Sequence, residues 1–185
     1  MDDSGIQWDT KFELSEENPQ NEACVVSQST NDRSNWWQGG DWMFTSQYNH
    51  TIDTKGRVIV PSKFRELLGN EFVITKGMDG CLFGFSQNDW TVFEQKLTSL
   101  PITNKNARKF ARFFLAGAAT VEIDGHGRVL IPSNLREFAD LEKDIVMVGV
   151  GSRLEVWSKD RWIAEDEDED MNAIGESMEN LGITI

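Results

Sequence analysis

The sequence predicts an α+β protein in which one small module of strands, tight turns and short helices occurs twice. Residues 52–69 and 123–140 align without gaps and share nine identities in eighteen positions. The match continues with one residue of slip, because residues 81–90 and 153–162 share a Leu, a Ser and a Trp at equivalent positions. Self-similarity at a fixed spacing marks a duplicated structural unit, so each element of the first copy should have a counterpart in the second.

The first copy contains four short segments that we predict to be strands: residues 47–53, 57–60, 71–76 and 80–85. The turn Thr54-Lys55-Gly56 separates the first two, and its glycine suits a tight hairpin between them. Pro61 is acceptable at the first position of a helix, which we expect over residues 63–68 with Gly69 as its C-cap.

A second helix is predicted to begin after Ser86. Asp89 lies three residues later at the capping-box position, with Asp in place of the usual Glu or Gln. Trp90, Phe93 and Leu97 then share one face of the helix, as expected of side chains that pack against a core. The counterparts in the second copy are the turn Gly125-His126-Gly127, Pro132 before a short helix, strands near 144–149 and 153–157, and Ser158 as a helix cap.

An amphipathic helix over residues 103–117 is predicted between the two copies. Four small or aromatic residues share one face of it: Ala107, Phe110, Ala111 and Phe114. Four basic residues share the opposite face: Lys105, Arg108, Lys109 and Arg112. The basic face is either an ordinary solvated surface or one that meets phosphates or a neighbouring subunit.

The negative charge of the chain is concentrated at its two ends. The formal net charge is −13, but residues 1–42 carry −7 and residues 163–185 carry −8, which leaves +2 for residues 43–162. Polar, acidic segments bury too little apolar surface to offset the entropy of ordering, so disordered acidic ends are expected. The predicted domains are an acidic extension (1–42), a first repeat with its following helix (43–101), a connecting helix (102–117), a second repeat (118–162) and an acidic tail (163–185).

Composition also bounds the location and the chemistry. No apolar run approaches the ~18 residues needed to span a bilayer, and the N-terminus is acidic where a secretory signal would be basic, so a cytoplasmic location is expected. Cys24 and Cys81 are too few for a tetrahedral metal site, and the apolar surroundings of Cys81 favour a buried thiol. The two histidines, His50 and His126, lie in different repeats. No metal, cofactor or small-molecule substrate is therefore predicted.

Each turn carries an Asp followed four residues later by an Arg. Asp53 with Arg57, and Asp124 with Arg128, flank their turns closely enough for an ion pair that pins the turn. A guanidinium group also suits recognition, because it can donate two parallel hydrogen bonds to a guanine edge or contact a phosphate. Lys cannot make this paired contact. The turns are the candidate functional loops of the chain.

The residues inside the two turns differ in charge. Lys55 adds a cation that attracts phosphates, whereas His126 at the equivalent position carries less positive charge at neutral pH. We therefore expect the second loop to bind DNA more weakly. The predicted DNA-binding residues are Lys55, Gly56, Arg57, His126, Gly127 and Arg128, with Asp53 and Asp124 pinning the loops.

The pattern I-D-x-x-G-R-[VL]-x-[VI]-P-x-x-[FL]-R resembles the signature of AbrB-type DNA-binding domains. Two copies in one chain, with DGCLF and ARFFLAGA between them and EVWSKDRW after the second, resemble the MraZ family from about Met43 to Trp162. The resemblance implies duplicated AbrB-like swapped-hairpin modules, a double-psi-like β-barrel, with flanking helices. Family members begin near Met43, so residues 1–42 are an addition and Met43 is a candidate start.

The resemblance further implies a transcriptional repressor of the division and cell-wall gene cluster, which acts on its own promoter and is associated with the nucleoid. Family members form homo-oligomeric rings and bind short direct repeats in double-stranded DNA through Asp-x-x-x-Arg loops. These loops correspond here to Asp53–Arg57 and Asp124–Arg128. No membrane partner is implied.

Two other classes of protein share part of this pattern. The sequences Ile-Asp-Thr and Ile-Asp-Gly are similar to aspartic-protease loops, whose two aspartates share a proton. Here, however, no glycine follows directly, and the nearby Arg would keep each carboxylate ionised. An AbrB-type antitoxin that binds a toxin through a disordered end is the stronger alternative, although single-copy antitoxins lack the duplication. The prediction is a DNA-binding regulator and not an enzyme.

Overall fold

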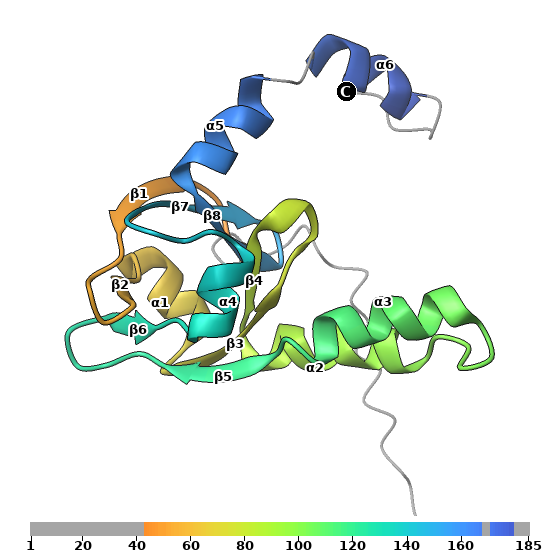
Figure 1. Ribbon diagram of the computed structural model, residues 1–185, viewed down its shortest axis with the longest axis horizontal. Helices are drawn as coiled ribbons and strands as arrows, with labels where there is room; N and C mark the ends of the chain where they lie inside the picture. The colour runs from red at the N-terminus through yellow and green to blue at the C-terminus, as the bar shows by residue number, and fades with distance from the viewer. Residues whose placement is uncertain (1–42, 168–170, 180–185) are drawn as a thin grey trace, which may run out of the picture. The chain divides into compact units, whose positions relative to one another are not determined.

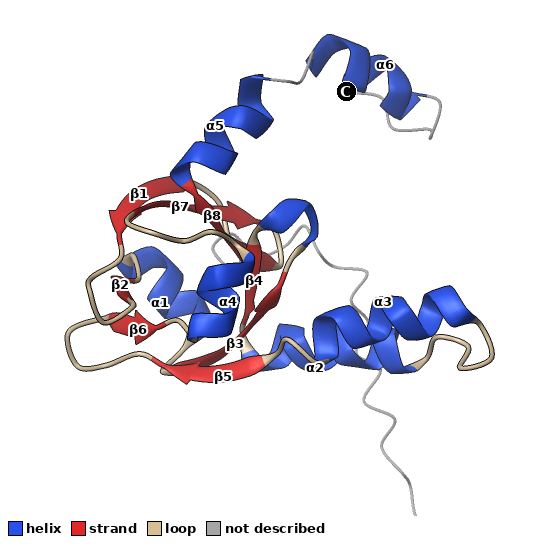
Figure 2. Cartoon of the chain, in the orientation of Figure 1, coloured by secondary structure: helices blue, strands red, loops and turns tan. Residues whose placement is uncertain are grey.

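A computed structural model of the chain describes residues 43–167 and 171–179 (Figure 1). Within them the strands form two antiparallel sheets, one of six strands and one of two (Figure 2). Helices accompany both sheets, so the predicted α+β class is confirmed. The prediction of a disordered extension over residues 1–42 concerns residues outside those described.

The elements of the first repeat are β1 (Gln47–Thr51), β2 (Arg57–Ile59), α1 (Ser62–Leu68), β3 (Glu71–Lys76), the 3₁₀ turn η2 (Met78–Gly80), β4 (Leu82–Phe85) and α2 (Gln87–Thr98). The helix α3 (Lys105–Leu115) follows. The elements of the second repeat are β5 (Ala119–Glu122), β6 (Arg128–Leu130), α4 (Ser133–Phe138), β7 (Asp144–Val150), β8 (Arg153–Ser158) and α5 (Lys159–Glu167), followed by α6 (Met171–Glu179).

The strand order shows that the two repeats are intertwined. The larger sheet has the order β1-β7-β8-β4-β3-β5. This order reads the same from either edge when each strand is exchanged for its counterpart in the other repeat. The smaller sheet joins β2 to β6, which are also counterparts. The repeats are therefore related by an internal pseudo-two-fold axis, and each contributes strands to both sheets.

The tight turns are present, but their flanking strands pair elsewhere. The Asp53 N–H donates to the Arg57 carbonyl at 2.8 Å, and the Gly56 N–H donates to the Asp53 carbonyl at 2.9 Å. Beyond the turn, β1 pairs with β7 and β2 with β6, while β5 pairs with β3. The predicted local hairpins are therefore limited to the turns and their immediate ends, as in the isolated antiparallel bridge between Ile123 and Val129, and the longer strand pairing expected beyond them was wrong. An alternating pattern specifies a strand but not its partner.

Helix ends follow the sequence closely. The Ser86 hydroxyl accepts from the Asp89 N–H at 3.2 Å, which confirms Ser86 as the N-cap, and the Asp89 carboxylate accepts from that hydroxyl at 2.7 Å instead of from the Ser86 backbone N–H as in a capping box. Gly69 ends α1, as predicted, with a φ of 79° and a ψ of −161°, a conformation that glycine adopts readily because it has no Cβ. Pro61 has a ψ of 142°, outside the helical range, so it is the N-cap and not the first helical residue, and α1 begins at Ser62.

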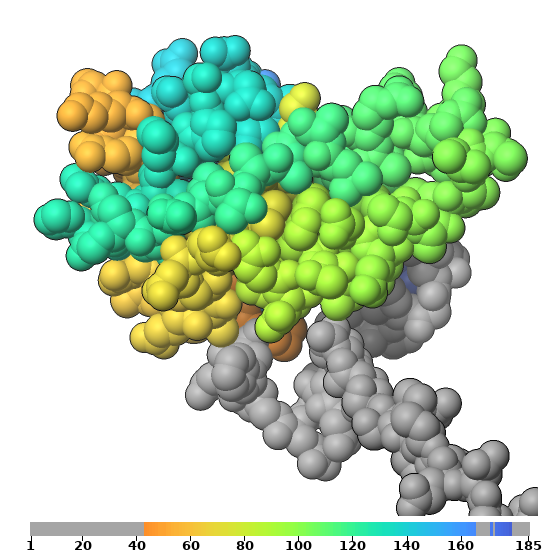
Figure 3. Space-filling view, turned by 90° about the horizontal axis from the view of Figure 1, so that it is seen from below, coloured from red at the N-terminus to blue at the C-terminus, as the bar shows by residue number. Residues whose placement is uncertain are grey.

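The buried side chains form two clusters. The first includes Val58 and Val129 from the small sheet and Phe64 and Leu135 from α1 and α4. The second is aromatic and includes Phe85 and Phe114, and it packs the α2–α3 helix pair onto the large sheet. Figure 3 shows α2 and α3 side by side on one face of the molecule.

Only part of the apolar face of α3 is buried. Phe114 is buried, and its carbonyl accepts a 2.6 Å hydrogen bond from the Thr75 hydroxyl, which fixes the end of α3 to β3. Phe110 shares the predicted face with Phe114 but is 45% exposed, so this face is not packed along its whole length. The packed part of α3 is its C-terminal half, and Phe110 lies one turn before Phe114.

Two further expectations can be compared with the structure. Cys81 is buried, as predicted, and burial raises the pKa of its thiol to about 12. The acidic tail was expected to be disordered, but α5 continues to Glu167 and α6 covers residues 171–179. In α6 the apolar residues Met171, Ile174 and Met178 recur at helical spacing, a signal that the net charge of the tail obscured.

Among the described helices, none combines the length and apolar character needed to cross a bilayer.

Candidate nucleic-acid interface

The two predicted loops lie on the same side of the molecule, at the left in Figure 1. Each leads into one strand of the small sheet, β2 or β6, which pair in antiparallel register with Val58 opposite Val129. Both valines are buried, at 1% and 2% exposure. The core therefore anchors one face of this two-stranded ribbon, and the ribbon positions both loops.

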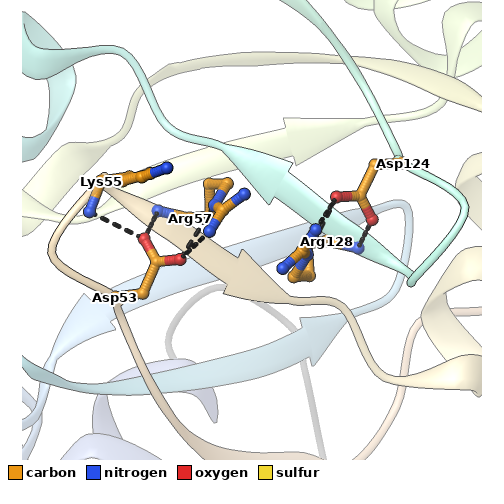
Figure 4. Close-up of polar contacts among 5 residues, drawn as sticks. All are labelled: Asp53, Lys55, Arg57, Asp124 and Arg128. Atoms are coloured by element: carbon orange, nitrogen blue, oxygen red, sulfur yellow. Dashed lines mark hydrogen bonds and ion pairs between the residues drawn. The ribbon is translucent and has the colours of Figure 1, made fainter.

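The first loop is organised around the Asp53 carboxylate. One oxygen, Oδ1, accepts from the backbone N–H groups of Lys55 and Arg57, both at 2.9 Å. The other, Oδ2, accepts from Nε of Arg57 at 2.8 Å and lies 2.7 Å from its Nη2. One carboxylate thus fixes both the backbone of the turn and the Arg57 guanidinium (Figure 4).

The second loop reproduces this geometry closely. Asp124 Oδ1 accepts from the backbone N–H groups of His126 and Arg128 at 2.9 Å. Its Oδ2 lies 2.9 Å from Nε and 2.8 Å from Nη2 of Arg128. Figure 4 shows Arg57 and Arg128 over neighbouring strands of the ribbon, each beside its own carboxylate. The predicted loop-pinning ion pairs are therefore present in both copies.

The pKa values follow from this geometry. The side-chain hydrogen bonds from Arg57, aided by the Arg57 and Lys55 backbone N–H groups, lower the pKa of Asp53 to about 2. The equivalent bonds from Arg128 and His126 lower the pKa of Asp124 as well. Both carboxylates are therefore ionised at neutral pH. Separate Arg partners and lowered pKa values oppose the proton sharing that an aspartic-protease pair requires.

The loops are also tied to the opposite repeat. The Val60 N–H donates to the Gly127 carbonyl at 2.9 Å, and the Ile131 N–H donates to the Gly56 carbonyl at 3.0 Å. These reciprocal bonds hold each loop against the strand end of the other repeat. The relative position of the two loops is thus part of the folded core, as a preorganised binding surface requires.

Glycine is needed in both loops for backbone and packing reasons. Gly56 and Gly127 have φ values of 82° and 75°, which side-chain-bearing residues rarely adopt. A Cβ on Gly56 would lie 2.7 Å from the Arg136 guanidinium, and one on Gly127 would lie 2.7 Å from that of Arg65. Each glycine therefore lets an arginine of the opposite repeat approach its loop.

Arg65 and Arg136 also belong to this surface, although they were not predicted as site residues from the sequence. They are counterparts, because both end the repeated motif on α1 and α4. Their recurrence was a usable signal, but their closeness to the loops depends on the exchange of strands between repeats. They add two cations beside the loop residues Lys55, Arg57, His126 and Arg128.

The basic face of α3 lies elsewhere. In Figure 1 α3 is on the right, away from both loops. A hollow of about 620 Å³ lies beside this helix, lined by Met78, Phe110, Phe113, Phe138, Lys109 and Arg161 among others. This hollow is a separate feature from the loop surface.

Within the described ranges, no three His, Cys, Asp or Glu side chains gather as metal ligands would.

Comparison with known proteins gives two kinds of match. The family model described as "MraZ protein, putative antitoxin-like" matches residues 43–113 and again residues 114–178, together more than half of the chain. Proteins named "Transcriptional regulator MraZ" are 54% identical over 142 residues in Clostridium acetobutylicum and 56% identical over 143 residues in Acetivibrio thermocellus. Each match covers 76% of this chain and 100% of the relative.

Among solved structures, the solution structure of PHS018 from Pyrococcus horikoshii is similar at 17% identity, with 58% of this chain and 91% of that chain covered. Its TM-score of 0.28 is too low to bear on the fold. The sequence relatives are decisive, since they share more than half of their residues with this chain over their full length. The chain belongs to the MraZ family.

Proposed function

We propose that this chain is a DNA-binding transcriptional regulator that recognises double-stranded DNA through the β2–β6 ribbon and its two loops. The observation that carries the proposal is the pair of matching Asp–Arg loops, held together on one side of the molecule. A preorganised guanidinium can read a guanine edge, and cations beside it can contact phosphates. The names of the relatives agree with this function.

The proposed fold is an AbrB-like swapped-hairpin barrel formed within one chain. Its support is the exchange of partners between repeats, since β1 pairs with β7, β3 with β5, and β2 with β6. We assign residues 43–162 to the duplicated core, with residues 1–42 and 163–185 as extensions. A chain cut to residues 43–167, which keeps α5 whole, should fold and bind DNA at least as tightly because acidic segments repel DNA.

The proposed role is repression of the chain's own promoter, at the head of a division and cell-wall gene cluster, in the cytoplasm and on the nucleoid. The proposed operator consists of short direct repeats spaced by about one helical turn, ~10 bp, so that successive protomers meet the same face of the duplex. A core that carries only +2 is too weakly charged to hold DNA as one protomer at physiological salt. Several protomers would raise the effective concentration of loops.

A homo-oligomer, with a closed ring as the proposed form, therefore accompanies this function. The hollow beside α3 is a suitable subunit contact, because Met78 and Phe110 are 47% and 45% exposed there. Its rim carries Lys109, together with Arg161, which is already paired with Asp140, whereas the segment after residue 162 is acidic. A second copy could thus supply complementary charge. Light scattering of the full chain, compared with its Phe110→Asp variant, measures whether this surface joins subunits.

Footprinting on DNA upstream of the chain's own gene tests the function. The wild-type chain should protect direct repeats, and the Arg57→Ala/Arg128→Ala double variant should protect none. Arg112→Ala, which removes an exposed arginine of α3, is the matched control and should leave the footprint intact. Inserting ~5 bp between two repeats should abolish cooperative binding, and inserting ~10 bp should partly restore it. Tight binding of a monomer to one isolated repeat would refute the direct-repeat assembly.

The antitoxin alternative has one observation in its favour, the words "antitoxin-like" in the family description. It predicts a tight complex with a small toxin encoded beside the gene, formed through an extension of the chain. A genetic neighbourhood of division genes with a protected promoter favours the regulator. A co-purifying toxin, with no protected DNA, would favour the antitoxin.

A further inference from the structure

The outer face of the β2–β6 ribbon carries two exposed aliphatic side chains. Ile59 is 52% exposed and Leu130 is 55% exposed, although both lie in short strands whose central valines are almost fully buried. Side chains alternate between the two faces of a strand. Ile59 and Leu130 therefore point away from the core, on the face opposite Val58 and Val129.

The register of the ribbon places these side chains with the arginines of the loops. Arg57 is opposite Leu130, and Ile59 is opposite Arg128. Residues directly opposite one another lie on the same face of an antiparallel pair. The outer face thus consists of an aliphatic pair with a guanidinium group at either side, and the pseudo-two-fold axis relates its two halves.

A single exposed aliphatic residue needs no explanation, but this pair has two unusual features. It occurs at equivalent positions of both repeats, next to the arginine of each ion pair. It also lies on the ribbon that carries the candidate loops, on the face where an aliphatic side chain is not buried in the core. The surroundings carry a net positive charge, because Lys55, Arg65 and Arg136 lie beside the two Asp–Arg ion pairs.

We propose that Ile59 and Leu130 contact thymine methyl groups in the major groove, and so contribute to the base sequence that the chain prefers. This inference rests on the proposed function. The major groove admits a two-stranded β-ribbon, and the thymine C5-methyl group is the apolar feature that its floor offers to such side chains. The flanking guanidinium groups would then reach guanine edges or phosphates on either side of the thymines.

The charge pattern favours DNA over a protein as the occupant of this face. A subunit contact that covered the aliphatic pair would also bury Arg57 and Arg128, whose side chains are each 30% exposed, together with their aspartates. Burying ion pairs at an interface costs desolvation energy that their attraction often fails to repay. A phosphate-lined groove instead complements Lys55, Arg65 and Arg136, the cations beside these ion pairs.

The test combines a change in the protein with a change in the DNA. The full-length wild type, Ile59→Ala and Leu130→Ala are titrated by fluorescence anisotropy against the footprinted operator. Each thymine is replaced in turn by deoxyuracil, which lacks only the C5-methyl group. Ile102→Ala, which removes a 78% exposed isoleucine before α3, is the matched control. Circular dichroism and light scattering of every variant verify fold and oligomeric state.

At a contacted thymine, the loss of the methyl group should weaken wild-type binding about three- to tenfold, the scale expected for one buried methyl group. Ile59→Ala or Leu130→Ala should weaken binding to the thymine operator by a similar factor. Either variant should then show no further loss at its own uracil position, because a coupled pair is non-additive. Ile102→Ala should respond to uracil as the wild type does.

Additive losses, or wild-type affinity in both alanine variants, would overturn the proposal. A change in oligomeric mass on Ile59→Ala would also overturn it, because the pair would then be a subunit contact. Failure of the proposed function looks different: Arg57→Ala/Arg128→Ala would bind the operator as the wild type does. If that double variant loses binding while the aliphatic variants do not, only this inference fails.

Discussion

The two loops have nearly the same shape but different charge. In each, one aspartate binds two backbone N–H groups and the guanidinium of an arginine, with distances that agree within 0.1 Å. The arginine side chains are 30% exposed in both. The middle residue of the turn, however, is Lys55 in one loop and His126 in the other.

This difference separates two tasks within the repeated motif. The residues that the loops share, Asp, Gly and Arg, set the geometry. The residue that they do not share sets the local charge and hence the attraction to phosphates. Substitutions that affect folding should therefore have equal effects in the two loops. Substitutions that affect DNA binding should have unequal effects.

Removing the arginines should give the largest effect. Arg57→Ala removes a preorganised contact from the more cationic loop, and the loss should be about 1–3 kcal/mol of binding free energy. Arg128→Ala should act in the same direction but less strongly. Gel shifts with the promoter measure both, with circular dichroism to verify that the fold is kept. Equal affinities for wild type and Arg57→Ala would remove this residue from the interface.

Substituting the glycines should affect stability, and to the same extent in both loops. Gly56→Ala and Gly127→Ala each force a residue with a Cβ into positive φ, which costs roughly 1–2 kcal/mol. Each Cβ also displaces the arginine of the opposite repeat. Urea unfolding gives the free energies, and Gly125→Ala, whose Cβ would meet nothing within 4 Å, is the control. A stability unchanged by Gly56→Ala would contradict the packing of this loop.

Exchanging the unshared residues should alter the salt dependence of binding. Lys55→His should make the slope of log K against log salt shallower by about one, because one phosphate contact is weakened. His126→Lys should make it steeper and raise the affinity at neutral pH. The double exchange keeps the total charge and should return the slope close to that of the wild type. Identical slopes in all four proteins would show that neither residue meets phosphate.

The same comparison explains what the sequence could predict. The Asp–Arg pairs, the tight turns and the Ser86 cap join residues at most four positions apart, so a local pattern determines them. The strand partners join residues such as Val58 and Val129. Their pairing depends on how two copies exchange strands, and alternation alone contains no information on that choice.

The surface around the loops was missed for the same reason. Arg65 reaches Gly127, and Arg136 reaches Gly56, only because the repeats are intertwined. Ile59 and Leu130 were missed because they are apolar. An alternating pattern predicts that a strand has two faces, but it does not show which face the rest of the fold buries. Helical period places Phe110 on the same face of α3 as Phe114, but how much of that face is buried depends on what α3 contacts.

The smallest expected effect concerns the pH dependence of the pinned loops. The hydrogen bonds from Arg57 lower the pKa of Asp53 to about 2, below the ordinary value of about 3.9. A carboxyl with a lower pKa in the folded state favours folding at pH values above its unfolded pKa, and this contribution is lost as the pH falls. The contribution of Asp53 should thus be complete above about pH 4 and vanish towards pH 2.

The contribution should be modest because both carboxylates are more than a third exposed and therefore screened by solvent. Urea unfolding of wild type and Asp53→Asn from pH 6 to pH 2 measures it, with Asp124→Asn as the counterpart and Glu94→Gln as a control outside the loops. The stability difference between wild type and either Asn variant should shrink only below about pH 4. A carboxyl carbon titration by NMR should place the Asp53 midpoint near 2, and Arg57→Ala should raise it. An Asp53 midpoint that does not move in Arg57→Ala would show that this ion pair does not hold the loop in solution.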